Sequence, residues 1–267
     1  MSTLAVDNLT DTQGSALLGR RNVIINGNFG INQRGVSGTV SLSAGAYGHD
    51  RWKAGASGCT YTFATSENIT TITITAGSLI QVVEGLNLVS GTHVLSWTGT
   101  AQGKIGAGSY GDSGVTGTVT GGSNLNIEFG TGTVSKVQLE VGTVATPFEH
   151  RSYGEELALC QRYYQRVGST SGDSMTPIYA TRNTTNQALL GYSAVQCLRA
   201  TPTVAMSGSF TLYGDGSGES LGAFGTVTAN QIENRQVTWT QTASGIGTGA
   251  GKVCYGSSAY FEFDAEL

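Results

Sequence analysis

The chain has 267 residues, of which 40 are glycine and only 12% are charged, and its formal net charge at pH 7 is −4. This composition excludes the basic footprint of a nucleic-acid-binding protein, and no apolar run approaches the roughly 18 residues of a membrane-spanning helix. Good helix formers are scarce whereas β-branched residues are plentiful, so we expect an all-β protein of one or two domains.

Residues 1–20 form a polar segment in which three apolar residues, Leu4, Val6 and Leu9, are spaced apart. Such a segment buries little apolar surface on its own, and it lacks the basic and apolar regions of a secretory signal. We expect an arm that anchors the protein to a partner through these three residues. A disordered tail is the alternative.

Residues 21–150 contain short alternating segments separated by glycine-rich turns. Val23–Ile25 is a short apolar run that ends at an Asn-Gly-Asn turn signal. Three further segments alternate apolar and polar residues with a period of two: Ile72–Thr75, Leu125–Phe129 and Val137–Val141. This alternation is typical of half-buried antiparallel strands, and many short strands with turns between them predict a β-sandwich or jelly roll.

Residues 151–168 contain one helical segment, with Ser152 and Glu155 as a capping box and Gly168 as the stop signal. Five residues follow one another at spacings of four and three: Tyr153, Leu157, Cys160, Tyr164 and Val167. This stripe predicts a seam at which parallel helices from several copies of the chain could pack. The alternative is a helix that packs on its own domain, because two heptads are fewer than a coiled coil usually needs.

Residues 169–267 return to strand patterns with glycine-rich breaks at Gly214–Gly218 and Gly245–Gly251. About 100 residues is an ordinary domain size, so we expect a second β domain here.

The sequence gives no sign of a catalytic, metal or cofactor site. The three histidines, His49, His93 and His150, are far apart, and the four cysteines show no zinc-ligand spacing. We therefore expect no catalytic residue, no metal and no cofactor. We expect the cysteines to be buried or half-buried thiols, although the sequence does not exclude a disulfide.

Five segments resemble one widespread family of bacteriophage tail fibres. The longest is Val137–Gln165, with the sequence VQLEVGTVATPFEHRSYGEELALCQRYYQ. Asn22–Arg34 (NVIINGNFGINQR) and Asp50–Trp52 are similar to the opening of such proteins, and Leu198–Val204 and Phe261–Leu267 are similar to their C-terminal module.

The resemblance implies a fold. It implies a jelly-roll β-sandwich like that of carbohydrate-binding modules over 21–150, a short linking helix and a second, C-terminal β-sandwich. It gives scaffold roles to Asp50–Trp52, whose tryptophan would pack in the jelly roll and whose charges would pair locally, and to Val137–Val141, which would be the last jelly-roll strand. It implies no catalytic residue.

The resemblance also implies a function, because such proteins form fibres or spikes, commonly trimeric, that adsorb to the host. Met1–Gly14 is similar to the starts of other phage virion proteins. We therefore expect a virion protein on the tail or head of the particle, bound to other virion proteins through its N-terminal arm. The module follows the arm with no shaft, which favours a short fibre or spike over a long fibre.

Host attachment would use a cell-surface glycan, which flat aromatic rings and neighbouring amides recognise well. The tryptophans, Trp52, Trp97 and Trp239, are more typical of a core. The candidate glycan site therefore consists of five residues in the distal domain: Tyr213, Tyr255, Tyr260, Asn230 and Asn234.

Two other functions stay open. One is a head-decoration or head-fibre protein with a structural role. The other is a glycan depolymerase, which would need two carboxylates about 5–10 Å apart in a groove.

Overall fold

The computed structural model describes residues 21–168, 173–184, 187–214, 217–220, 229–233, 236–242 and 252–267, and the side chains within 21–168, 190–208 and 259–267. The chain divides into two compact units. Unit 1 extends to Glu156 and includes Leu267, and unit 2 covers Leu157–Glu266. The candidate arm residues Leu4, Val6 and Leu9 lie outside the described residues.

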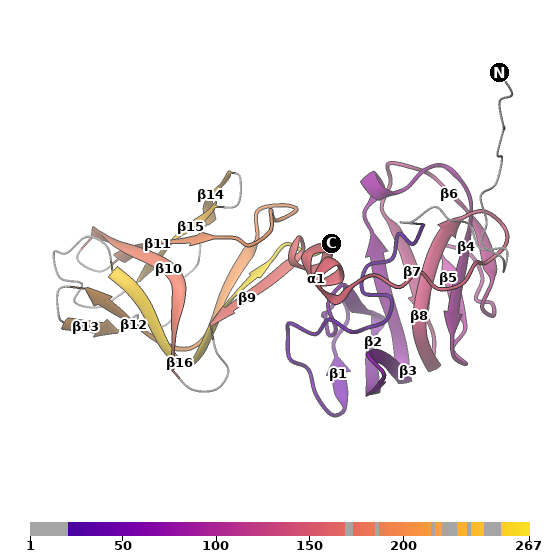
Figure 1. Ribbon diagram of the computed structural model, residues 1–267, viewed down its shortest axis with the longest axis horizontal. Helices are drawn as coiled ribbons and strands as arrows, with labels where there is room; N and C mark the ends of the chain where they lie inside the picture. The colour runs from indigo at the N-terminus through magenta and orange to yellow at the C-terminus, as the bar shows by residue number, and fades with distance from the viewer. Residues whose placement is uncertain are drawn as a thin grey trace, which may run out of the picture. The chain divides into compact units, whose positions relative to one another are not determined.

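Unit 1 is built from antiparallel strands (Figure 1). Its elements are β1 (Val40–Leu42), β2 (Trp52–Ser66), β3 (Ile69–Val83), the short 3-10 helix η1 (Gly85–Asn87), β4 (Gly91–Thr98), β5 (Gly103–Ile105), β6 (Val115–Val119), β7 (Leu125–Phe129) and β8 (Gly132–Val141). The strands pair in the order β1-β2-β3-β8-β4-β6, and β3 also pairs with β7, which pairs with β5.

One apolar core lies inside this sheet. Strands from both ends of the pairing order contribute to it, with Val40 on β1, Trp52 on β2, Trp97 on β4 and Val119 on β6, and Phe129 on β7 joins them. A flat sheet could not bring these side chains together, so the sheet bends around the core. Along β7 the buried residues Ile127 and Phe129 alternate with the more exposed Asn126 and Glu128, as the period of two predicts.

Two long strands of unit 1 each pair with different neighbours along their length. The first half of β3 pairs with β8 at Ile72 and Val134, whereas its second half pairs with β7 at Leu79 and Phe129. In the same way the start of β8 pairs with β3, and the rest of β8 pairs with β4, where Leu139 lies opposite Leu95. Each of these two long strands therefore joins two parts of the sheet.

The segment before β1 docks on β8 without forming a strand. Val23 donates its N–H to Leu139 O at 3.1 Å, and Val137 donates to Gly27 O at 2.8 Å. Gly27 must be glycine here, because a Cβ atom would lie 2.3 Å from Val137 O. The apolar residues Ile24 and Ile25 are buried, so this segment closes one side of the core.

The helix α1 covers Tyr153–Gln161 and begins as its capping motif predicts, since Ser152 Oγ accepts the Glu155 N–H at 3.3 Å. The predicted helix over 151–168 is too long, however. The strand β9 (Tyr164–Gly168) follows and pairs with β16 (Lys252–Asp264), where Val167 lies opposite Phe261. The helix ends because Gln165 Nε2 caps Gln161 O at 2.9 Å and the aromatic and β-branched residues beyond it join a sheet.

The predicted trimer seam is wrong as a single helical stripe. Tyr164 and Val167 belong to β9, and Tyr164 and Cys160 are buried within unit 2. On the helix itself, Tyr153 is 68% exposed and Leu157 is half-buried. Local spacing predicted one element where the fold builds two.

Unit 2 is also an antiparallel sheet (Figure 1). Besides β9 and β16 it contains β10 (Asp173–Thr184), β11 (Gln187–Ser193), β12 (Thr203–Gly214), β13 (Ser217–Ser220), β14 (Ala229–Glu233) and β15 (Gln236–Thr242). The pairing order is β13-β12-β16-β10-β11-β15-β14, with β9 added to β16. Tyr192 stacks on Phe263 at a centroid distance of 4.5 Å, which forms part of the buried core.

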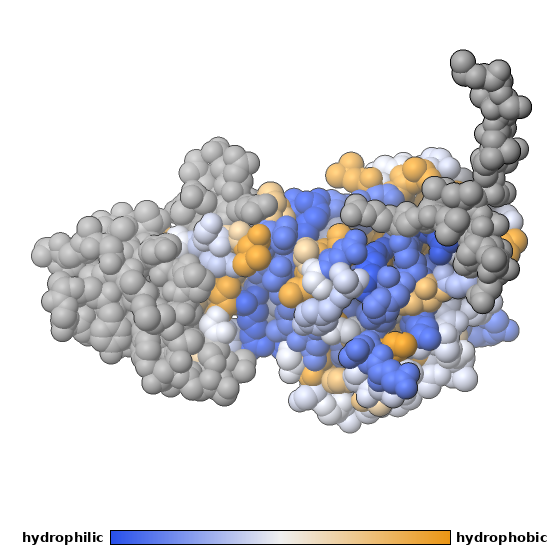
Figure 2. Space-filling view, viewed as in Figure 1, coloured by the Kyte–Doolittle hydropathy of each residue, from blue (hydrophilic) through white to orange (hydrophobic). Residues whose placement is uncertain are grey.

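The all-β prediction is confirmed for the described residues, which form antiparallel sheets and one α-helix. That helix is too short and too polar to cross a membrane. Figure 2 shows hydrophilic residues over much of the described surface, with apolar residues scattered among them. Trp52 and Trp97 are buried, as expected of core tryptophans.

Candidate functional site

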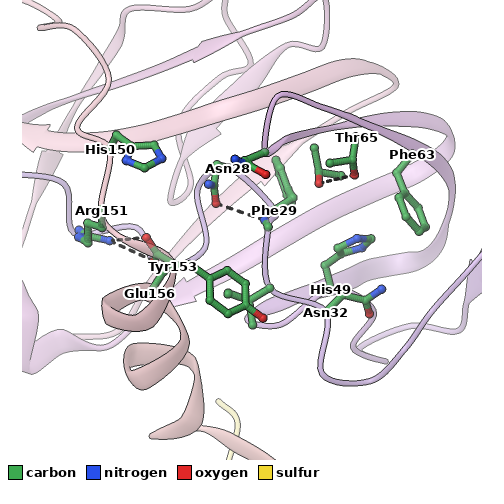
Figure 3. A pocket seen from close by; sticks show the side chains of 14 residues that line it. Asn28, Phe29, Asn32, His49, Phe63, Thr65, His150, Arg151, Tyr153 and Glu156 are labelled. Carbon is green, nitrogen blue, oxygen red and sulfur yellow. Dashed lines mark hydrogen bonds and ion pairs between the residues drawn. The ribbon is translucent and has the colours of Figure 1, made fainter. Parts of the chain in front are cut away.

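A pocket of about 450 Å³ opens on unit 1 (Figure 3). Three stretches of chain line it: the turn at 28–32, the facing ends of β2 and β3 with the turn at Asn68, and the residues 150–156 that lead into α1. Its volume lies in the range of roughly 300–1,000 Å³ that is usual for small-molecule sites. The pocket is therefore large enough for one or two sugar rings.

Aromatic rings form the floor of the pocket. Phe29 is buried, packs on Trp52 at a centroid distance of 4.8 Å and lies edge-on to His49 at 6.4 Å. Phe63 lies edge-on to His49 at 4.6 Å from the opposite side. Because these rings hold one another in place, the apolar floor exists before any ligand binds.

His49 is a buried and neutral part of this cluster. Its exposed fraction is 2%, and its Nδ1 lies 3.0 Å from Tyr61 Oη. Burial removes water from the imidazole and lowers the pKa of His49 to about 4. At neutral pH this side chain therefore brings no positive charge to the pocket.

Amides and hydroxyls form the rim. Asn28 Oδ1 accepts the Gly30 N–H at 3.2 Å, and Asn32 holds its own turn through two bonds to the Val36 backbone at 2.9 and 3.0 Å. Thr65 and Thr70 join the ends of β2 and β3 through their hydroxyls, 2.9 Å apart. These groups are fixed in orientation, and an amide or hydroxyl can both donate to and accept from a ligand.

The two charged residues of the pocket neutralise each other. Arg151 Nη1 lies 3.2 Å from Glu156 Oε1 and also donates to Ile24 O at 2.9 Å, while Nη2 donates to Asn22 O. Glu156 Oε1 also accepts the Asn26 N–H at 2.6 Å. Both side chains are mostly buried, so they act as a clamp between the 22–26 segment and the start of α1.

Tyr153 lies at the mouth of the pocket. Its side chain is 68% exposed and projects from the first turn of α1, on the side where Asn32 and His49 lie (Figure 3). The sequence placed Tyr153 in the seam, whereas the structure places it among the residues of this pocket.

The tyrosines predicted to bind glycan lie in unit 2. Tyr255 on β16 lies opposite Thr211, and Tyr213 on β12 lies opposite Val253, so the two occupy neighbouring register positions. Tyr260 is half-buried on β16, and one face of its ring is covered by Arg166, whose guanidinium carbon is 3.3 Å from the ring centroid. A covered ring is a poor stacking surface for a sugar.

Of the two predicted amide partners, only Asn230 lies in the part of the chain that the structure describes. Asn230 lies on the edge strand β14, and three strands separate β14 from β16 in the pairing order. Asn234 lies outside the described residues.

The other histidines and the cysteines of the described residues do not form a reactive site. His93 is buried and His150 is exposed, and Cys59 and Cys160 are buried while Cys197 is exposed. Burial raises the pKa of the Cys59 thiol to about 11, which makes it a poor nucleophile. Within the part of the chain that the structure describes, no three His, Cys, Asp or Glu side chains come close enough to hold a metal ion.

Sequence reasoning missed the pocket because its members looked like turn and core residues. Asn28, Phe29 and Asn32 stand in a segment that reads as a turn, and Phe63 stands in an alternating strand. The available signal was the concentration of three asparagines and one phenylalanine within 26–32.

Comparisons of the chain with protein-family models, with curated proteins and with solved structures find no match.

Proposed function

We propose that the chain is a bacteriophage virion protein that attaches the particle to a glycan on the host surface. The observation that carries this proposal is the pocket of unit 1, whose aromatic floor and amide rim have the chemistry that sugars require. The half-buried ring of Phe63 and the exposed ring of Tyr153 can accept the C–H face of a sugar, and the fixed amides and hydroxyls of the rim can bond its hydroxyl groups.

The contacts between the phage-like segments support this proposal. Trp52 Nε1 donates to Asn26 O at 3.0 Å, the Asn22 N–H bonds Glu149 Oε2 at 2.7 Å, and Glu156 holds the Asn26 N–H. Segments that resemble the phage family at 22–34, 50–52 and 137–165 therefore meet in one hydrogen-bonded joint. This is the arrangement expected if the three segments belong to one module.

We assign unit 1 to the jelly-roll class and unit 2 to a second β-sandwich domain. The support for unit 1 is an antiparallel sheet that bends around a single core. The support for unit 2 is its separate compact unit with its own buried aromatic cluster.

Attachment through this protein would be multivalent. Several copies on one particle, commonly a trimer in the family it resembles, would convert weak sugar binding into strong adhesion if all copies can engage together. The arm at residues 1–20 would join the protein to other virion proteins.

The test is competition for adsorption. Purified full-length protein, added in excess to host cells, should reduce adsorption of the phage that encodes it, and enzymatic removal of surface polysaccharide should abolish binding of the protein to cells. A protein that binds the particle but neither host cells nor their polysaccharide would refute the proposal and favour a head-decoration role.

A further inference from the structure

Among the described tyrosines, Tyr153 combines an exposed ring with a place in the lining of a formed pocket. Two tyrosines with described side chains are exposed, Tyr153 at 68% and Tyr110 at 41%. Lys104 Nζ lies 4.8 Å from the ring centroid of Tyr110, so one face of that ring is already covered by a cation. No hydrogen bond or ring contact to another described residue holds Tyr153, whose exposed face offers a platform on which a sugar ring can stack.

The charged groups at the pocket offer an acidic ligand little to pair with. A carboxylate or sulfate is usually recognised by a guanidinium that can offer two parallel N–H groups. The one arginine of the lining, Arg151, already bonds two backbone carbonyls and Glu156. His49 is neutral, and His150 is exposed to water, where ion pairs contribute little.

The polar groups that remain suit hydroxyls. Asn28 has a bond from Gly30 to its Oδ1, while its Nδ2 makes no bond to another described residue. Asn68 stands exposed in the turn between β2 and β3 and also lines the pocket. Neutral groups that donate and accept match a sugar hydroxyl, which also does both.

We propose that this pocket selects an uncharged pyranose, such as a hexose or N-acetylhexosamine unit of a host polysaccharide, which stacks on Tyr153 and bonds Asn28. The inference rests on the proposed glycan attachment and adds to it the class of sugar and the residue that determines specificity. It also moves the glycan site from the distal tyrosines to unit 1.

The experiment uses the full chain and saturation-transfer NMR, which detects weak binding at millimolar sugar concentration. Neutral methyl pyranosides and N-acetylhexosamines are compared with sialic acid and glucuronic acid at low and high salt. We expect binding of at least one neutral sugar that salt leaves unchanged, and no salt-sensitive binding of the acids.

Three variants locate the site. Tyr153→Ala should weaken sugar binding at least tenfold, whereas Tyr153→Phe, which keeps the ring, should bind within about twofold of the parent. Tyr110→Ala is the matched control, because it removes an exposed tyrosine ring elsewhere on unit 1 and should leave binding unchanged. Circular dichroism confirms that each variant is folded.

The possible failures are distinguishable. Acidic sugars that bind through Tyr153 with strong salt dependence would overturn the neutral class and leave glycan attachment standing. Sugar binding that survives Tyr153→Ala would place the site elsewhere and overturn the inference. If the protein blocks phage adsorption but binds no sugar of either class, the pocket is not the receptor site. If it neither blocks adsorption nor binds sugar, the proposed function itself fails.

Discussion

Asn26 holds the turn that positions the pocket. Its φ is 57°, its exposed fraction is 0%, and its side chain makes three hydrogen bonds: Nδ2 to Ile31 O at 2.8 Å, Nδ2 to Asp50 O at 3.0 Å, and Ile31 N–H to Oδ1 at 2.9 Å. Asparagine is one of the few residues with a side chain that enters this left-handed region readily. Asn26 therefore adopts the left-handed conformation that the turn needs and also supplies hydrogen-bond partners to the buried backbone groups of Ile31 and Asp50.

Replacing Asn26 should destabilise unit 1 strongly. For Asn26→Ala we expect a loss of about 3–5 kcal/mol of unfolding free energy, because buried backbone groups lose their partners and alanine disfavours positive φ. Asn26→Gly keeps the backbone conformation available and should cost about 1 kcal/mol less. Urea unfolding measures both, with Asn126→Ala on the exposed face of β7 as the control. Equal losses for the two variants would show that backbone strain plays no part.

His49 should make unit 1 sensitive to acid. The pKa of His49 is about 4 in the folded protein against an ordinary value of 6.5, so its stabilising contribution is fully present above pH 6.5. Between pH 6.5 and 4, His49 binds a proton in the unfolded chain but not in the folded chain. The unfolding free energy should therefore fall, by roughly 3 kcal/mol on reaching pH 4.

The variant His49→Gln isolates this effect. Burial raises the pKa of the neighbouring Asp50, so Asp50 contributes in the opposite direction, favouring the folded state as it becomes protonated. Since Asp50 is present in both proteins, the difference between their pH profiles belongs to His49. Urea midpoints at several pH values should converge between parent and variant as pH falls; parallel profiles would contradict the shifted pKa.

Among the elements, β8 is the strand on which the rest of unit 1 assembles. It pairs with β3 and β4 and receives the 22–27 segment at Val137 and Leu139. Gly27 allows that last approach, since no larger residue fits against Val137 O.

A matched pair of glycine substitutions tests this contact. Gly27→Ala should cost about 3 kcal/mol, because the added methyl group collides with a backbone carbonyl that cannot move without disturbing β8. Gly154→Ala adds the same group in α1, where nothing lies within 4 Å, and should stabilise by about 0.5–1 kcal/mol. Thermal unfolding should show a lower Tm for Gly27→Ala and a higher Tm for Gly154→Ala. A neutral Gly27→Ala would show that the segment is loosely docked.

The elements that sequence predicted well are those defined by local pattern. Leu125–Phe129 is β7 in full, and the cap at Ser152 starts α1. The end of α1 could not be predicted in the same way, because Tyr164 leaves the helical pattern only through pairing with Asp264, a residue 100 positions later in the chain. Pairing between distant segments carries no local signal.

At the scale of the whole molecule, the same reason hid the pocket. Its lining joins residues near 30, 65 and 153, and their proximity depends on the complete sheet. Sequence reasoning expected aromatic rings with amides for glycan binding and placed them in the distal domain, whereas the pocket proposed here lies in unit 1.

The oligomeric state is the remaining prediction at this scale. A trimeric fibre or spike should give a solution mass about three times 27.6 kDa by light scattering. Because the helical stripe is interrupted after Gln161, Leu157→Ser, a substitution at a half-buried position on α1, should leave that mass unchanged. A monomer would remove multivalency from the attachment mechanism, and dissociation by Leu157→Ser would restore the helix as an interface.

The clamp between the two ends of unit 1 determines how the protein would carry mechanical load. Arg151 donates hydrogen bonds to Asn22 O and Ile24 O, and Glu149 accepts the Asn22 N–H. The chain therefore enters and leaves the unit at one joint, formed by residues 22–24 and 149–151. Tension applied between the arm and the segment beyond residue 152 would pass through this joint, where several charge-assisted bonds resist it together. The strands of the sheet would lie outside the path of the force, whereas the pocket adjoins the joint, because Arg151 and Glu156 line it. Tension on the tether would therefore reach the site at which a sugar binds.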